Sequence, residues 1–429
     1  MDFNPNIICY FCGYIIIYIV YSWRGKCKGI NTTSFFLLYY GFTGFCGFYF
    51  YNISNGLFRD FSNITAMPFV FLFSCIIISI SPFYKYDKYS PHISISSKQY
   101  KFIDGLSLFL GLCALLPFLE SLVKIPSSLG HSESMAEMYE ARLYGVKVEN
   151  YHSWVGRRFY EVISYSSLIT PICLMIQLTK KKLNLKAILS LSLCFITIIM
   201  HNMISGGRSN SLQDIMYLFV VYMLYKRNFP LKIQKKVRRY GSILIGIGLA
   251  GMMAVTLSRF SALTHNNYDN VFEAMSLYSG EGPINFNNNL WSIKKTSGGY
   301  RTFGFYLGVI DGHLPTVEEL WGYGDKIGIE GNIFYTWVGD FYSDFGLYSF
   351  WIILLLTSFW YFFIVNAKRT ISISRFVVLA LWAKVLVVGP LFFTYAPVFE
   401  QYKIGIALLC CVILNNLSFT NKKIIVTHE

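Results

Sequence analysis

Charged residues are scarce in this sequence. Asp, Glu, Lys and Arg make up 14% of its 429 residues, whereas a typical soluble domain carries about 25%. Water is therefore not the main solvent of the folded chain. The hydrophobic residues gather in blocks of roughly 17 to 22 residues, which is the length a helix needs to cross about 30 Å of hydrocarbon. We expect an all-α polytopic membrane protein that forms a single membrane domain over residues 1–429.

Several signatures of soluble chemistry are also missing. The sequence has no phosphate-loop motif, no dinucleotide-binding fingerprint and no metal-ligand spacing, so cytoplasmic nucleotide chemistry is unsupported and we expect neither metal nor cofactor. Nine of the ten cysteines lie in or beside apolar blocks, where a buried hydrophobic role fits them better than a disulfide framework or a zinc site. The net charge of +14 falls in short runs between these blocks, which indicates membrane orientation and argues against nucleic-acid binding.

The apolar blocks predict about eleven transmembrane helices. The first block lacks the basic region and cleavage site of a signal peptide, so we expect it to stay as the first span. The expected spans are Asn6–Trp23, Ser34–Tyr51, Met67–Phe83, Phe102–Leu119, Tyr160–Leu178, Leu185–Ile204, Ser211–Tyr225, Gly241–Leu257, Gly346–Val365, Phe376–Phe393 and Ile404–Phe419.

Lys and Arg are divided unevenly between the two sides that alternate loops must take. The loops after spans one, three, five, seven and nine, with the C-terminal tail, carry 23 against 12 in the other set. Because cytoplasmic loops accumulate positive charge, the first set is predicted inside. The two long loops, Glu120–Phe159 and Ser258–Phe345, then lie on the exported side. Both are rich in aromatic residues, unlike disordered segments, so we expect a folded exported cap.

The turn between spans six and seven places a glycine pair, Gly206 and Gly207, directly before Arg208. At the start of a helix, free backbone N–H groups and the helix dipole favour anions. This turn is therefore a candidate cradle for a diphosphate. A tight interhelical turn whose arginine reaches to the membrane interface explains the same residues equally well, and both interpretations stay open.

Four further arginines are predicted on the exported face: Arg157, Arg158, Arg259 and Arg301. A guanidinium group holds two phosphate oxygens at once and stays charged at any relevant pH. Each of these residues taken alone is better explained as an interface anchor or a salt-bridge partner. Their number on one face of an apolar bundle favours a shared anionic site.

Histidine is the side chain best suited to act as a general base near neutral pH. His313 lies in a turn-like stretch shortly after Arg301, which makes it the candidate base, with an ordinary surface histidine as the alternative. Exported carboxylates are too numerous for spacing to select one. They are Glu281, Asp311, Glu318, Glu319, Asp325, Glu330, Asp340 and Asp344.

The topology with two long exported loops resembles the O-antigen and oligosaccharide repeat-unit polymerases (Wzy-type), among the GT-C-like membrane glycosyltransferases. The resemblance is strongest at Ser205–Ser209 and at Gly331–Gly346. The second segment adds three candidate site residues, Asn332, Asp340 and Asp344. Spacings found in these polymerases and in related O-antigen ligases are matched from Arg208 to Leu212, from His313 to Gly324 and from Arg301 to Gly312. The family commonly has an even number of spans with both termini inside, and the predicted count of eleven departs from this.

The resemblance implies a reaction in a bacterial inner membrane, with the active site on the exported face. A growing glycan would pass from undecaprenyl diphosphate to the non-reducing end of an incoming undecaprenyl-diphosphate-linked repeat unit. The arginines would stabilise the departing diphosphate, and His313 would deprotonate the acceptor hydroxyl. Membrane lipids, a chain-length regulator and a repeat-unit flippase are the implied partners, with no nucleic acid.

Three other functions stay open at the level of sequence. An O-antigen ligase uses the same donor and differs in its acceptor. A transporter or flippase of lipid-linked oligosaccharides is disfavoured because few ionisable residues lie deep in the predicted spans, although Lys384 does. A polytopic receptor or scaffold would leave the exported arginines unexplained.

Overall fold

The computed structural model describes residues 4–23, 30–54, 61–130, 153–180, 182–204, 208–241, 246, 271–329, 333–365 and 370–419. Within these ranges the chain is helical apart from turns and two three-residue strands, β1 (His92–Ser94) and β2 (Thr370–Ser372). The all-α prediction is confirmed for this part of the chain.

Five helical segments are long and apolar enough to cross a membrane. They are α3 (Ala66–Tyr89), the part Ser97–Lys124 of α4 (Ser97–Gly130), the part Leu185–Asn202 of α8 (Leu185–Ile204), the run Thr336–Ile364 and the part Val398–Ser418 of α17 (Val398–Phe419). A bent pair of shorter helices raises the number to six if it forms one span. These helices indicate a membrane-embedded protein. The count of eleven spans stays a prediction, and its eighth span, Gly241–Leu257, falls largely outside the described residues.

The predicted single span over Tyr160–Leu178 is broken. It consists of α6 (Trp154–Tyr165) and α7 (Thr170–Leu178), which meet at an angle of 69°. The Ser166 hydroxyl donates to the carbonyl of Ile163 at 2.8 Å, and Pro171, at the start of α7, has no N–H with which to continue a helix. Side-chain bonding and proline thus end one helix and begin the next, so the predicted span over Tyr160–Leu178 consists of two helices and not of one.

The chain forms two compact units, and each is assembled from separate segments. Unit 1 comprises Met1–Pro91, Tyr268–Ile371 and Val378–Tyr402, and unit 2 comprises His92–Asn267, Ser372–Val377 and Lys403–Glu429. Two helices, α16 (Ile373–Val388) and α17, contribute residues to both.

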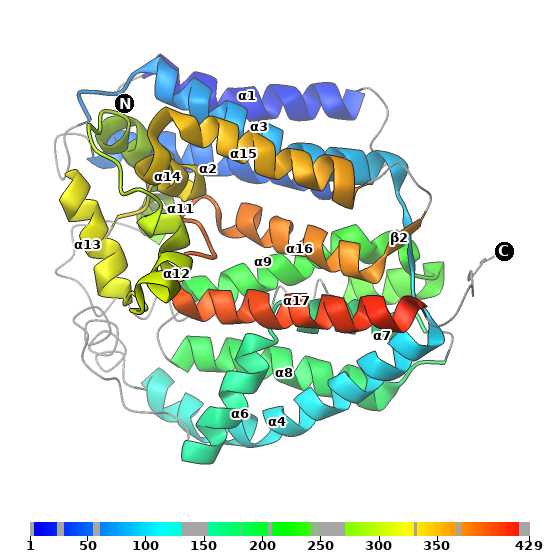
Figure 1. Ribbon diagram of the computed structural model, residues 1–429. Helices are drawn as coiled ribbons and strands as arrows, with labels where there is room; N and C mark the ends of the chain where they lie inside the picture. The colour runs from blue at the N-terminus through cyan, green and yellow to red at the C-terminus, as the bar shows by residue number, and fades with distance from the viewer. Residues whose placement is uncertain are drawn as a thin grey trace. The chain divides into compact units, whose positions relative to one another are not determined.

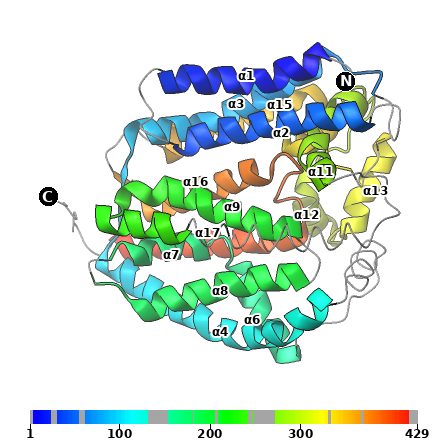
Figure 2. The same cartoon turned by 180° about the vertical axis from the view of Figure 1, so that it is seen from behind.

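Unit 1 contains a set of long helices with a group of shorter helices at one end. The helices α1 (Pro5–Tyr21), α2 (Thr32–Ser54), α3 and α15 (Ser349–Phe359) run side by side (Figure 1). At one end lie α11 (Val271–Asn285), α12 (Tyr300–Asp311), α13 (Val317–Ile327) and α14 (Thr336–Phe345), as both views show (Figures 1 and 2). These helices belong to the predicted second long loop, whose exported side stays a prediction, although α14 is also the first part of the candidate span Thr336–Ile364.

Unit 2 packs α4 along α8, with α6 and α7 beside them (Figure 2); α9 (Arg208–Tyr225) follows α8. The connections after predicted spans three, five and seven meet at one end of this unit. The Asn228 side chain accepts from the N–H of Ile93 at 3.0 Å, and the hydroxyls of Thr179 and Tyr225 lie 3.4 Å apart. The three basic connections therefore lie at one end of unit 2, and their location on the cytoplasmic side stays a prediction.

Two glycines allow α11 to contact α2 closely. A Cβ atom on Gly280 would lie 2.2 Å from the backbone nitrogen of Gly47 and 2.3 Å from the carbonyl carbon of Cys46. A Cβ on Gly47 would lie 3.0 Å from the carbonyl oxygen of Gly280. Small residues at such a crossing let helix backbones approach, as is common between membrane helices.

We expect Gly280→Ala to destabilise the protein by about 3 kcal/mol, because the added methyl group meets backbone atoms that cannot rotate away. The measurement is the free energy of unfolding in mixed detergent micelles. Gly105→Ala is the matched control, since a Cβ there has no neighbour within 4 Å and alanine favours a helix by up to about 1 kcal/mol. Equal stability of the two variants would contradict the close contact.

Candidate functional site

A buried ion pair joins α12 to α14 in unit 1. The Nε of Arg301, on the first turn of α12, lies 2.6 Å from Oδ1 of Asp340, and the side chains are 11% and 3% exposed. The second carboxylate oxygen of Asp340 accepts from the backbone N–H of Phe393 at 2.6 Å. Three separate segments therefore meet at one desolvated carboxylate, which makes this pair the centre of the candidate site.

Asp344 lies one turn after Asp340 on α14 and binds the first turn of α12. Its two oxygens accept from the backbone N–H groups of Arg301 at 3.0 Å and Thr302 at 2.7 Å, and from the hydroxyls of Ser297 and Thr302. The first N–H groups of a helix have no partner within the helix, and a carboxylate is favoured there by the helix dipole. Asp344 thus orients the start of α12 and, with it, Arg301.

The start of α14 is held by the segment that follows α16. The N–H of Thr336 donates to the carbonyl of Leu391 at 3.1 Å, and that of Trp337 donates to Gly389 at 2.8 Å. Thr336 has a φ of 71°, in the left-handed region that costs a non-glycine residue about 1–3 kcal/mol. These bonds keep Thr336 in that conformation and fix where Asp340 lies.

One edge of Arg301 has no partner. The guanidinium group carries five N–H donors, and its Nη1 is buried without a hydrogen bond, although the guanidinium carbon lies 5.6 Å from the centre of the Tyr335 ring. A buried donor without an acceptor is costly, the more so when it is charged. This edge is therefore suited to an oxygen atom of a ligand.

The local charge limits which ligand oxygen that is. Asp340 offsets the charge of Arg301 directly, and Asp344 adds a second carboxylate beside it, so the three side chains together carry a formal charge of −1. The N–H groups around Asp344 compensate for part of this charge. The cluster matches a neutral or singly charged oxygen better than a free diphosphate.

His313 lies at the other end of α12 from Arg301. A helix of 12 residues is roughly 18 Å long at 1.5 Å per residue, and His313 follows its left-handed C-terminal residue, Gly312. The proximity in sequence of His313 and Arg301 therefore does not bring their side chains together.

The His313 side chain pairs with Glu319. Its Nε2 lies 3.0 Å from each Glu319 oxygen, and the side chains are 69% and 46% exposed. Glu319 also accepts from the N–H of Thr316 at 2.8 Å, while the Thr316 hydroxyl accepts from the N–H of Glu319 at 3.2 Å, which is a capping box at the start of α13. The hydrogen bond from the Thr316 N–H is the main cause that lowers the pKa of Glu319 below its ordinary value, and the bond with His313 acts in the same direction. Because Glu319 contacts Nε2, Nδ1 is the ring nitrogen of His313 that could accept a proton from a substrate.

Arg157 and Arg158 lie on α6 in unit 2, where both pair with Glu161. The nitrogen–oxygen distances are 3.3 Å and 2.8 Å, and both arginine side chains are more than half exposed. Arg158 also lies over the ring of Trp154 at 5.9 Å. These contacts are those of interface anchors and surface ion pairs.

The other predicted residues are described in part or not at all. Arg208 is the first residue of α9, but its side chain lies outside the described part of the structure, as do Gly206, Gly207, Arg259 and Asn332. Arg301, Asp340 and Asp344 come together in unit 1, whereas Arg157, Arg158 and Arg208 belong to unit 2. A cradle shared by all the arginines stays a prediction.

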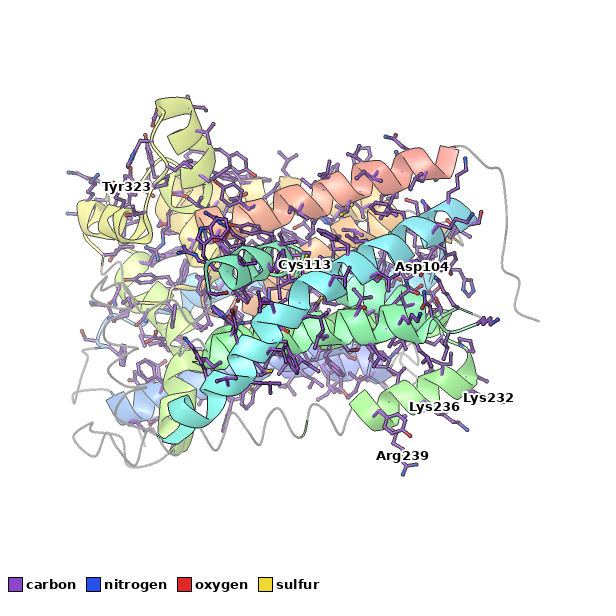
Figure 3. All side chains as sticks on the ribbon, turned by 90° about the horizontal axis from the view of Figure 1, so that it is seen from below. Asp104, Cys113, Lys232, Lys236, Arg239 and Tyr323 are labelled. Atoms are coloured by element: carbon purple, nitrogen blue, oxygen red, sulfur yellow. The ribbon has the colours of Figure 1, made fainter. Side chains whose placement is uncertain are left out.

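Sequence analysis missed a polar cluster in unit 2. Oδ1 of Asp104, on α4 (Figure 3), accepts from the ammonium group of Lys180, from Gln177 at 2.7 Å and from Asn184 at 3.3 Å. Gln177 is fully buried, and its Oε1 has no hydrogen-bond partner. Asp104 falls within the candidate span Ser97–Lys124, where ionisable residues usually have a functional role. In the sequence, the position of Asp104 near the start of an apolar block pointed to this cluster.

We expect Arg301→Gln to lower the free energy of unfolding by about 3–5 kcal/mol, because it leaves the Asp340 carboxylate buried without its cation. The double variant Arg301→Gln/Asp340→Asn should recover part of this loss, which unfolding in mixed micelles measures. Arg157→Gln removes an exposed ion pair within one helix and should cost less than about 0.5 kcal/mol. If Arg301→Gln cost no more than this control, the pair would not be desolvated.

Acidification should loosen the start of α13. Since folding lowers the pKa of Glu319, the cap stabilises α13 above the ordinary pKa of glutamate and is lost as the pH falls through the lower value of the folded state. Amide exchange at residues 317–321, expressed as protection factors, should therefore decline between about pH 6 and about pH 3. Glu319→Gln keeps a capping group that does not titrate, and a decline of the same size in this variant would point to another group.

Comparison with known proteins gives no match from which a function could be inferred. The chain matches no protein-family model, no curated protein sequence and no solved structure. The resemblance to repeat-unit polymerases thus stays a prediction from the residues that carry it. Within the described residues, no group of three His, Cys, Asp or Glu side chains is arranged to hold a metal ion. The buried cluster around Arg301 is the feature on which a proposal can be built.

Proposed function

We propose that this chain is a membrane glycosyltransferase that elongates lipid-linked oligosaccharides. In this proposal the growing glycan is transferred from undecaprenyl diphosphate to the non-reducing end of an incoming undecaprenyl-diphosphate-linked repeat unit, on the exported face of a bacterial inner membrane. The observation that carries the proposal is the unpaired, buried edge of Arg301, held in a fixed position by Asp340 and Asp344. A preorganised donor of this kind stabilises negative charge that develops during a reaction.

The proposed transfer is a displacement at the anomeric carbon of the donor glycan. The acceptor hydroxyl oxygen forms a bond to that carbon, the bond from the carbon to the diphosphate oxygen breaks, and its electron pair leaves with the diphosphate. The proton of the acceptor hydroxyl passes to a base. Asp340 and Asp344 are positioning residues in this scheme, because their oxygens are occupied by Arg301 and by the backbone.

The net charge of the Arg301, Asp340 and Asp344 cluster suits Arg301 to a single substrate oxygen and not to the whole diphosphate. Because Asp340 already offsets the charge of Arg301, we assign Arg301 to a single oxygen of the donor, away from the acceptor hydroxyl that His313 would deprotonate, since α12 separates the two residues. The assignment of the diphosphate charge to Gly206, Gly207 and Arg208 rests on the sequence alone, because a glycine pair before an arginine at a helix start favours anions. Arg157, Arg158 and Arg259 are further candidates for that charge.

His313 is the proposed base. Its pairing with Glu319 at 3.0 Å gives the imidazolium that forms on proton transfer a carboxylate partner, which is the arrangement that general-base histidines use. The exposure of His313 leaves it accessible to an acceptor sugar from the exported side.

A specific observation also favours a second function, the transport of lipid-linked oligosaccharides. The cluster of Asp104, Lys180 and Gln177 places an ionisable pair and an unpaired buried acceptor beside a candidate span. Transporters use such groups to couple movement to ions.

The test is an in vitro elongation assay. The purified protein is incubated in lipid nanodiscs with the undecaprenyl-diphosphate-linked repeat unit of its own strain, and products are resolved by size. We expect a ladder of longer lipid-linked glycans. Arg301→Lys keeps a cation for Asp340 but removes the guanidinium N–H groups that do not contact Asp340. It should therefore slow elongation by about 10²–10³-fold. Arg208→Ala should abolish the ladder, and His313→Ala should reduce it strongly.

Arg375→Lys is the control for Arg301→Lys, because Arg375 is exposed on α16 and has no assigned role. Unfolding midpoints of all variants separate loss of activity from loss of folding. A full ladder with Arg301→Lys would exclude the assigned role of Arg301. Transfer to a lipid A core without a ladder would identify a ligase. Movement of the substrate across proteoliposomes without any transfer, abolished by Asp104→Asn, would replace the enzyme with a transporter.

A further inference from the structure

The connection after α9 contains a helical segment, 231–241, with an unusual distribution of charge. Between residues 226 and 241 there are seven Lys and Arg and no Asp or Glu. Five of these cations lie in the helical segment, and all five are exposed. They are Lys232, Lys235, Lys236, Arg238 and Arg239. Figure 3 shows Lys232, Lys236 and Arg239 projecting outward from this segment.

The cations occupy one face of the helix. At about 100° per residue, the five fall within an arc of roughly 160°, with Lys232, Lys235 and Arg239 nearest its centre. Ile233, Val237 and Tyr240 lie on the opposite arc, and the first two are less exposed than the cations. A cationic face opposite an apolar one is the pattern of helices that bind the headgroup region of membranes.

More cations lie at the same end of unit 2. The bond between Ile93 and Asn228 brings the connection before α4 beside the start of this basic segment. The contact between Thr179 and Tyr225 brings in the end of α7. The first turns of α4 and the connection after α7 supply further exposed lysines, namely Lys98, Lys101 and Lys182. This end of unit 2, where α4 begins and α7 and α9 end, therefore carries many exposed cations.

We propose that the segment 231–241 is a binding surface for the headgroups of anionic phospholipids. Its charge is complementary to them, it lies next to helices of membrane-spanning length, and clusters of four to eight Lys and Arg beside a membrane span attract anionic lipids. The surface would enrich such lipids around unit 2. This role does not depend on the reaction proposed above, because none of its residues belongs to the candidate site.

The experiment uses the full chain in lipid nanodiscs made of phosphatidylcholine alone or with phosphatidylglycerol. Amide hydrogen exchange of residues 231–241 is measured in both. Binding of anionic headgroups should slow this exchange severalfold in the phosphatidylglycerol discs, and 1 M salt should remove the difference, since salt at that concentration screens charges beyond about 3 Å. The triple variant Lys232→Gln/Lys236→Gln/Arg239→Gln should lose the difference.

Two control variants keep the test decisive. Lys294→Gln/Lys295→Gln/Lys326→Gln removes the same charge from exposed positions of unit 1 and should keep the lipid effect. Lys232→Arg/Lys236→Arg retains the charge and should keep it as well, while unchanged exchange in α8 and α9 reports that each variant is folded. Equal exchange in the two lipids, or the same slowing in the triple Gln variant, would overturn the proposal. Slowing by soluble RNA or heparin but not by phosphatidylglycerol would assign the surface to a soluble polyanion.

Discussion

A polar group buried among apolar side chains must find its partner within the protein, because no water reaches it. This constraint determines the region where α12 meets α14. Asp344 accepts from four donors at the start of α12, and Asp340 accepts from Arg301 and from the backbone of Phe393. Each contact satisfies a group that would otherwise be buried alone. The Nη1 of Arg301 departs from this rule, and such departures in a folded protein call for a functional explanation.

The same constraint explains how far the sequence predicts the fold. Spanning helices must be long and continuously apolar, so α3, α4, α8 and α17 could be located from hydropathy alone. The break between α6 and α7 could not, because a hydropathy window averages over the Ser166 hydroxyl and the missing N–H of Pro171. These act through single hydrogen bonds. The assembly of each unit from separate segments of the chain likewise leaves no local signal.

The candidate site was predictable in its members but not in its contacts. Asp340 and Asp344 are four residues apart, a spacing that places both carboxylates on one face of a helix. Their pairing with Arg301 joins positions about forty residues apart, and nothing in the sequence selected this arginine over the others. His313 shows the opposite case. It follows Arg301 closely in sequence, yet α12, which is kinked at Phe303, lies between the two, and a helix advances about 1.5 Å with each residue.

The cations of the described chain occur in two settings: some pair with a carboxylate in a fixed geometry, and others are gathered in the exposed basic segment 231–241. In the part of the chain that the structure describes, the five cations of the helical segment 231–241 are exposed, and that segment contains no Asp or Glu, whereas Arg157, Arg158 and Arg301 each pair with a carboxylate. Paired guanidinium groups give direction and fixed geometry more than net attraction. A cluster of exposed cations attracts an anionic surface without geometric selection. The proposed site around Arg301 would need the first kind to distinguish one substrate oxygen, and the proposed lipid-binding segment would need the second.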